Sequence, residues 1–193
     1  MGSMDPVVSR LLHGKIRPAM QVPILTRRLE LRPFAASDVD GIADLLSDPE
    51  ATKFIGSTKS RQAAAESVLL MRDAFVMRGF GTLAVVPQDK KTCVGYCGVR
   101  PLAHTAEIEI AFALQKQCWN QGYATEAAEA SIDAAFKNLS MKSIVATVYP
   151  DNRPSLRVLE KLGMRFECEV FGHWPMTVAL LFRLDAQSWQ GGS

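Results

Sequence analysis

The sequence predicts a single-domain α/β fold, and three features of the chain support this class. Strand-like and helix-like patterns follow one another along the whole chain. The length of 193 residues and the hydrophobic share of 48% suit one domain with a complete core. The clearest pattern, at residues 107–136, is a strand that leads through a glycine-containing turn into a helix. The remaining elements are predicted around this unit.

The strand at residues 107–114 has side chains that alternate between its two faces. One face carries Ile108, Ile110, Phe112 and Leu114, and the other carries Glu107, Glu109, Ala111 and Ala113. A polar connection follows and closes at Gly122, and strong helix formers continue from Tyr123 to about Phe136. This arrangement predicts a buried strand with two glutamates on one face.

The turn at Gly122 has the features of an anion-binding site. The first amides of a helix have no partners within the helix, and the helix dipole adds positive charge there. Glycine permits a positive φ and a close approach of a ligand, and Ala124 and Ala127 keep the first turn small. Neither a G-x-x-x-x-G-K-[ST] loop nor a G-x-G-x-x-G turn after a strand is present. The turn is therefore either a diphosphate site of another kind or an ordinary structural turn.

The segment before this unit is predicted to contain three strands and two helices. The first strand is at residues 29–33, and a helix capped by Ser37 ends before Pro49. A second helix runs from Ser60 to about residue 77. A hairpin then joins strands at residues 82–86 and 92–99, which completes this half of the chain.

The segment after the central unit predicts a strand, a helix and a closing strand pair. The strand spans residues 143–149, and Asn152 caps a helix that ends at Gly163. Residues 167–170 and 178–184 are the closing strands.

Composition and cysteine spacing narrow the class of protein. A net charge of +2 gives no strong nucleic-acid signal, and no apolar run reaches the roughly 18 residues of a membrane span. No signal peptide is recognisable, so a cytoplasmic protein with reduced, buried thiols and no metal site is expected. Residues 1–23 form an N-terminal arm, of which residues 1–3 are typical of a cloning remnant.

Three motifs resemble one known family. Residues 119–127 read W-N-Q-G-Y-A-T-E-A, residues 152–164 read N-R-P-S-L-R-V-L-E-K-L-G-M, and residues 26–33 read T-R-R-L-E-L-R-P. In this order they resemble the GNAT superfamily of N-acetyltransferases, closest to its RimJ/RimL-like branch. The resemblance covers residues 24–189 and leaves a tail at 190–193. It implies a mixed, mostly antiparallel sheet of about six to seven strands with helices on both faces.

The resemblance also implies a cosubstrate and the residues that bind it. Acetyl-CoA would enter between two diverging strands, those at residues 107–114 and 143–149. Its diphosphate would contact the backbone amides of Gln121, Gly122, Tyr123, Ala124 and Thr125, because Trp119 replaces the Gln or Arg that begins this motif in many relatives. The pantetheine arm would contact Phe112, Ala113, Leu114 and Asn152, with Ser155 near the sulfur.

Acid–base chemistry assigns roles to the two glutamates. An attacking ammonium must lose a proton before it reaches a thioester, and a carboxylate accepts that proton directly or through water. Glu109 is the first choice as base because it is nearer the diphosphate turn, and Glu107 would attract a cationic substrate. The alternative for both is a solvated strand end with salt bridges. Phe54 and Phe80 are expected either to line the amine cleft or to belong to the core.

The predicted function is acetyl-CoA-dependent acetylation of a primary amine, either a protein N-terminus or a small amine. The amine would attack the thioester directly, and Ser155 would assist the leaving thiolate. No cysteine stands in a nucleophile setting, which agrees with direct transfer. The alternative is a non-catalytic CoA-binding or protein-interaction module that does not need Glu109. Homodimers are common in the family.

Overall fold

The computed structural model describes residues 19–171 and 177–191, which form a helix-flanked sheet of eight strands in the order β1-β2-β3-β4-β5-β6-β8-β7. The strands are β1 (Ile24–Leu25), β2 (Leu29–Arg32), β3 (Thr82–Pro87), β4 (Gly95–Pro101), β5 (Ile108–Leu114), β6 (Ser143–Val148), β7 (Arg165–Phe171) and β8 (Val178–Asp185). The predicted α/β class is confirmed. The strand beyond the expected seven is β1, whose two residues are too few to give a pattern.

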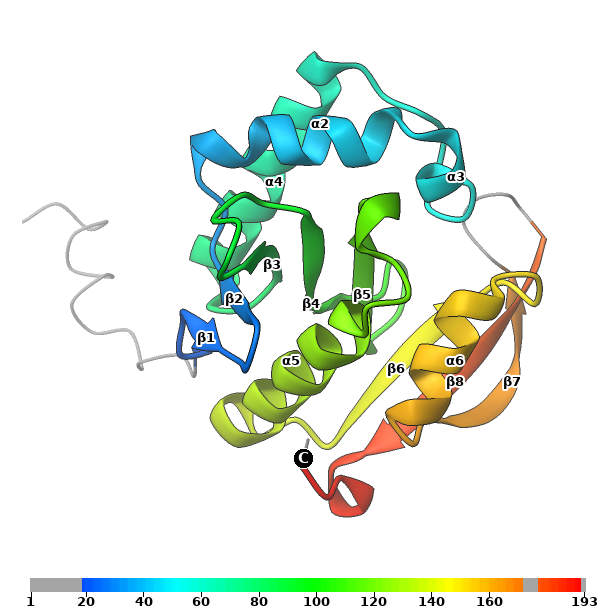
Figure 1. Cartoon of the computed structure of the whole chain (residues 1–193). Helices are drawn as coiled ribbons and strands as arrows, with labels where there is room; N and C mark the ends of the chain where they lie inside the picture. The colour runs from blue at the N-terminus through cyan, green and yellow to red at the C-terminus, as the bar shows by residue number, and fades with distance from the viewer. Residues whose placement is uncertain (1–18, 172–176, 192–193) are drawn as a thin grey trace, which may run out of the picture.

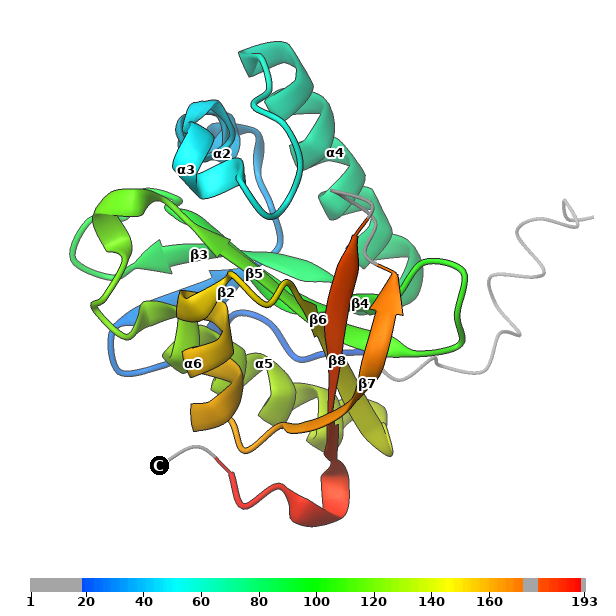
Figure 2. The same cartoon turned by 90° about the vertical axis from the view of Figure 1, so that its right-hand side faces the viewer.

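Helices cover both faces of the sheet, as predicted (Figures 1 and 2). One face carries α2 (Val39–Ser47), α3 (Pro49–Thr52) and α4 (Arg61–Arg78), and the other carries α5 (Tyr123–Leu139) and α6 (Arg153–Lys161). Short 3-10 helices lie at Ala36–Asp38, Lys116–Cys118 and Ala186–Ser188.

The predicted alternation along β5 decides which layer each side chain joins. Ile110 and Leu114 belong to the larger core with α5, and Phe112 packs against it. Ala113 packs on the other face, against the smaller core under α2 and α4. The glutamate-bearing face of β5 therefore looks toward the helices α2 and α4, away from α5.

The β5–β6 pair is the one parallel pair of the sheet and the point where the sheet divides. Among the described residues, the two strands share a single register pair, Glu109 with Val145. In Figure 1 they diverge from there toward the end of β5, and α3 lies above the opening. The predicted divergence of the two strands is thus present, and the entry of acetyl-CoA between them stays a prediction.

Local signals located most of the helix ends, with exceptions that have physical reasons. Ser60 and Asn152 cap α4 and α6 through their side chains, as predicted. Ser37 is not the cap of α2: it lies within the preceding 3-10 helix, and α2 begins after Asp38, so that prediction is wrong.

The predicted start of the second hairpin strand is also wrong, because β4 begins at Gly95 rather than at residue 92. Gly95 has a φ of +151° and lies so close to β5 that a Cβ would stand 2.1 Å from the Ala113 carbonyl oxygen. The backbone conformation of Gly95 and its close approach to β5 therefore set where β4 begins, and the residue pattern did not reveal this position. Predictions for residues 1–18 and 172–176 lie outside the described residues.

Candidate active site

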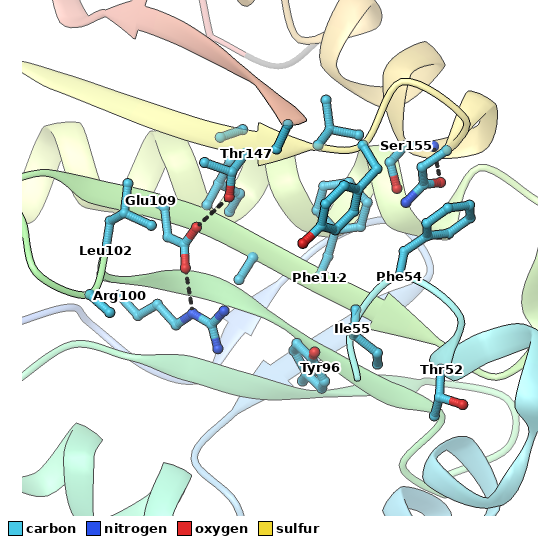
Figure 3. Close-up of a pocket in the computed structure, with 18 of the residues that line it drawn as sticks. Thr52, Phe54, Ile55, Tyr96, Arg100, Leu102, Glu109, Phe112, Thr147 and Ser155 are labelled. Carbon is cyan, nitrogen blue, oxygen red and sulfur yellow. Dashed lines mark hydrogen bonds and ion pairs between the residues drawn. The ribbon is translucent and has the colours of Figure 1, made fainter. Parts of the chain in front are cut away.

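A cleft of about 590 Å³ opens where β5 and β6 diverge (Figure 3). Its walls come from the α3–α4 segment, α4, both diverging strands, the start of α6, and the β7–β8 pair. Of the residues predicted for the site, the lining contains Phe54, Glu107, Glu109, Phe112, Asn152 and Ser155. The fold thus brings together residues that are up to about half the chain apart.

Glu109 lies at the floor of the cleft, with 7% of its surface exposed. Arg100, its register partner on β4, donates from Nε to Oε1 at 2.8 Å. Thr147 on β6 donates its hydroxyl to Oε2 at 3.3 Å (Figure 3). One carboxylate oxygen is therefore held by each neighbouring strand, which fixes the carboxylate's orientation at the point where the strands part.

Glu107 borders the same cleft and forms a salt bridge. A salt bridge was one of the two alternatives predicted for this residue, the other being attraction of a cationic substrate. Arg183 on β8 binds both carboxylate oxygens, at 3.1 and 2.9 Å, and also pairs with Glu167 on β7. The hydrogen bonds from Arg183 lower the pKa of Glu107. A role of Glu107 toward a substrate stays a prediction.

The turn before α5 has the backbone conformation that the sequence predicted. Gly122 has φ +81° and ψ 0°, and it caps α5 without any side-chain bond. Glu126 N–H donates to the Gly122 carbonyl at 3.1 Å, so the amides of Tyr123, Ala124 and Thr125 precede the first turn's hydrogen bond.

Trp119 anchors the start of this connection. Its indole Nε1 donates to the carbonyl oxygen of Leu114 at 2.7 Å. The indole thus ties the turn to the end of β5. Phosphate contact by the amides that follow stays a prediction.

Arg28 is a residue that the sequence analysis missed. Its guanidinium pairs with Glu126 at 2.7 Å, donates to the Gln121 carbonyl at 2.8 Å, and lies 4.8 Å from the centre of the Tyr123 ring. Thr26 adds a hydroxyl hydrogen bond of 2.6 Å to Glu126. The sequence held one indication of this pair: Arg28 and Glu126 lie in two of the motifs that resemble the family, at residues 26–33 and 119–127.

The Thr26–Arg28–Glu126 cluster stabilises an ionised carboxylate in the first turn of α5. Burial by itself raises the pKa of Glu126, but the hydrogen bonds from Thr26 and Arg28 outweigh it and lower that pKa. Because these partners lie on the β1–β2 segment, they join the edge of the sheet to the turn.

Asn152 and Ser155 lie together at the N-terminus of α6, and Figure 3 labels Ser155 there. The Asn152 side-chain oxygen accepts a 3.3 Å hydrogen bond from the Ser155 amide. This is the predicted helix cap, and it places both residues in the cleft lining. Tyr96 lies in the same lining, and burial raises the pKa of its phenol, so its hydroxyl is protonated at neutral pH.

The two predicted phenylalanines separate. Phe54 lines the cleft and stacks on Tyr149, with ring centres 6.3 Å apart, and Lys53 lies 4.9 Å from its ring centre. Phe80 packs against the larger core and is absent from the described lining of this cleft. Phe80 follows the end of α4 and belongs to no periodic pattern, so the sequence did not show that its side chain packs against the core.

The cysteines agree only in part with the expectation of buried thiols. Cys93, Cys97 and Cys118 are buried, whereas Cys168 is exposed on β7, so the expectation is wrong for Cys168. Over residues 19–171 and 177–191, no His, Cys, Asp and Glu side chains gather into a group that could hold a metal, and no helix is long and apolar enough to cross a membrane.

The comparison with family models decides the class of this protein. The model of the Acetyltransferase (GNAT) domain matches residues 28–165. The chain belongs to the GNAT acetyltransferase family. This stretch contains the turn at Gly122, both glutamates and the N-terminus of α6, so the match covers the cleft described above except for its β7–β8 wall.

Relatives of this acetyltransferase agree with the assignment. An uncharacterized N-acetyltransferase, YnaD of Bacillus subtilis (strain 168), is 32% identical over 150 residues, which are 75% of this chain and 83% of that protein. The crystal structure of a GNAT-family acetyltransferase from Bacillus anthracis has a TM-score of 0.75 at 26% identity and covers 85% of this chain and 98% of that one. The predicted N-acetyltransferase class is thus confirmed.

The fold is also shared with Mycobacterium smegmatis RimJ, solved in complex with CoA-disulfide. That structure has a TM-score of 0.68 at 21% identity and covers 85% of each chain. It shows that the RimJ-like resemblance extends to the arrangement of the elements.

Proposed function

We propose that this acetyltransferase moves an acetyl group from acetyl-CoA to a primary amine, by direct attack of the amine on the thioester. The observation that carries the proposal is the single register pair between β5 and β6, beyond which the cleft opens between the two strands and reaches the N-terminus of α6. A thioester arm can lie in this opening while its diphosphate reaches the turn at Gly122.

The turn supplies what a diphosphate needs. The amides of Tyr123, Ala124 and Thr125 come before the first turn's hydrogen bond, at the positive end of the helix dipole. Glu126 would repel the phosphates, and Arg28 neutralises it at 2.7 Å. The RimJ relative, whose structure contains CoA-disulfide, supports a CoA donor.

Glu109 is the proposed base of the reaction. As the amine nitrogen attacks the thioester carbonyl, it loses a proton, which Glu109 accepts directly or through one water. Each carboxylate oxygen retains a lone pair beyond its bond to Arg100 or Thr147, so proton acceptance needs no rupture of these contacts.

Ser155 is the proposed partner of the leaving group. When the carbon–sulfur bond breaks, the CoA thiolate acquires a negative charge, and a hydroxyl at the α6 N-terminus can donate to it. Asn152, whose side-chain oxygen holds the Ser155 amide, positions this hydroxyl and offers its amide group to the pantetheine arm. The amine acceptor is a protein N-terminus or a small amine.

The first test is the melting temperature with and without acetyl-CoA, with NADH and ATP as controls. At a hundred times its dissociation constant a ligand adds about 2.7 kcal/mol, which is roughly 5–11 °C for a chain of this size. A shift with acetyl-CoA alone supports the donor assignment. No shift refutes it.

The second test separates catalysis from binding alone. Glu109→Gln should lower turnover at least about tenfold, because proton transfer contributes roughly 10²–10⁴-fold, while the affinity for acetyl-CoA is kept. The exposed Glu160→Gln on α6 is the control. Unchanged turnover in Glu109→Gln removes this residue from the mechanism, and an absence of turnover in the unmodified protein favours a CoA-binding module.

A further inference from the structure

Large apolar side chains that a soluble protein normally buries are exposed in the lining of the cleft. Leu70 on α4 is 71% exposed, Phe171 at the end of β7 is 84% exposed, and Ile55 after α3 is 39% exposed. All three line the cleft described above. Scattered exposed apolar residues are ordinary, but several that border one concave site mark a surface for a ligand.

A buried apolar cluster forms another part of the same cleft lining. Leu102 packs with Leu181 and Val170 there, on the same side as Glu109 (Figure 3 labels Leu102 and Glu109). The apolar wall is defined by six residues of the described lining: Ile55, Leu70, Leu102, Val170, Phe171 and Leu181. It comes from segments on both sides of the cleft, so a group that enters between them contacts apolar surface on two sides.

The charges of the lining argue against a polycationic acceptor. Both described carboxylates, Glu109 and Glu107, are already bound by arginines, Arg100 and Arg183. Lys59 adds a cation to the same lining. Glu107 shares Arg183 with Glu167, which leaves one net negative charge at that end of the cleft. That charge suits the single ammonium of a monoamine before it loses its proton, and it leaves nothing for a second cation.

We propose that the apolar wall selects the acceptor, and that the acceptor is a primary monoamine with an aliphatic or aromatic substituent. This inference rests on the proposed function and names its substrate class. The net negative charge at Glu107 attracts the ammonium, and the amine nitrogen lies toward Glu109, two residues along β5. The substituent lies against the apolar wall, where it removes Leu70 and Phe171 from water. Specificity then grows with the apolar area of the substituent.

The test is a matched set of amines with acetyl-CoA, measured by release of the CoA thiol. Propylamine, butylamine and hexylamine add methylenes at nearly constant basicity, and kcat/KM should rise about two- to fourfold per methylene. Pentane-1,5-diamine has the length of hexylamine with a terminal ammonium in place of the methyl group. Its kcat/KM should be at least about tenfold below that of hexylamine, because the ammonium must be desolvated.

A paired substitution on α4 tests the wall itself. Leu70→Glu places a carboxylate in the lining, and the exposed position makes the change compatible with folding. The variant should lower kcat/KM for hexylamine about tenfold and raise it for the diamine. Leu69→Glu is the matched control, because Leu69 is its neighbour on the helix, is 46% exposed and is absent from the described lining.

The outcomes distinguish this inference from the proposed function. The apolar wall is supported if kcat/KM rises along the alkylamine series and if Leu70→Glu, but not Leu69→Glu, changes the preference from hexylamine toward the diamine. Equal or better use of the diamine by the unmodified protein, or equal effects of Leu69→Glu and Leu70→Glu, overturns it and leaves the acetyltransferase function intact. If no amine releases CoA although acetyl-CoA raises the melting temperature, the substrate class is wrong. If acetyl-CoA also fails to stabilise the protein, the proposed function falls with it.

Discussion

Replacing Arg28 with alanine tests the proposed diphosphate site at the Gly122 turn. The substitution removes a 2.7 Å ion pair with Glu126 and a 2.8 Å hydrogen bond to the Gln121 carbonyl. The pair is partly exposed, with Arg28 at 39% and Glu126 at 17%, so solvent screening reduces its value. Loss of hydrogen bonds to a charged group costs about 1.5–3 kcal/mol at most. We expect a loss of about 1–2 kcal/mol, or roughly 2–8 °C in melting temperature.

The effect on acetyl-CoA is predicted separately, from charge. Without Arg28, the Glu126 carboxylate is left uncompensated within one helical turn of the diphosphate. At a separation of roughly 8 Å and an effective dielectric constant between about 20 and 80, repulsion is about 0.5–2 kcal/mol per phosphate charge. One phosphate charge at this separation corresponds to a roughly 2- to 30-fold rise, so the KM for acetyl-CoA should rise by at least this factor while kcat changes little.

Steady-state kinetics with two donors provides the assay. Acetylpantetheine lacks the diphosphate, so Arg28→Ala should leave its KM unchanged. Adding Glu126→Gln removes the uncompensated charge and should restore much of the affinity for acetyl-CoA. Arg61→Ala is the control, because its ion pair with Asp40 is exposed and far from the turn in sequence. An equal rise in KM for both donors, or no rescue by Glu126→Gln, refutes this account of the turn.

Three further predictions follow from the geometry. Gly122→Ala strains a residue with φ +81°, so it should cost about 1–2 kcal/mol of stability and weaken acetyl-CoA binding. The control is Gly163→Ala, with φ +71° at the end of α6, which should cost the same stability and leave the KM for acetyl-CoA unchanged. Equal effects of the two substitutions on this KM would contradict the assignment of the turn. Because Arg183 lowers the pKa of Glu107, this pair contributes its full stability above the ordinary glutamate pKa and loses it as the pH falls through the lowered pKa. The difference in melting temperature between the unmodified protein and Glu107→Gln should therefore shrink between pH 7 and pH 3. A difference that stays constant with pH would exclude this linkage. Burial raises the pKa of Cys93 and of Cys97 to about 12. A thiol reagent at pH 8 should therefore label the exposed Cys168 first. Fast labelling of two or more cysteines in the folded protein would contradict the burial of the other three.

The sequence predicted the parts of this protein that depend on a few neighbouring residues. Period-two alternation in β5 identified which side chains face α5 and which face α2 and α4. Glycine at position 122 predicted a left-handed turn at the start of α5, and Asn152 predicted the cap of α6. Each of these follows from backbone sterics or from a hydrogen bond within three residues, so no distant part of the chain is needed.

The tertiary structure decided the partners of the charged groups. Glu109 pairs with Arg100 because antiparallel register sets them opposite each other, and Arg28 meets Glu126 across 98 positions of sequence. Phe80 lies in the larger core although its residue type suited the cleft equally well. A single sequence shows the number of available arginines and phenylalanines but not the register that selects among them. The sequence by itself therefore determined the backbone turn and the helix cap, and only the packed sheet determined which charges are compensated and which surface is left for an acceptor.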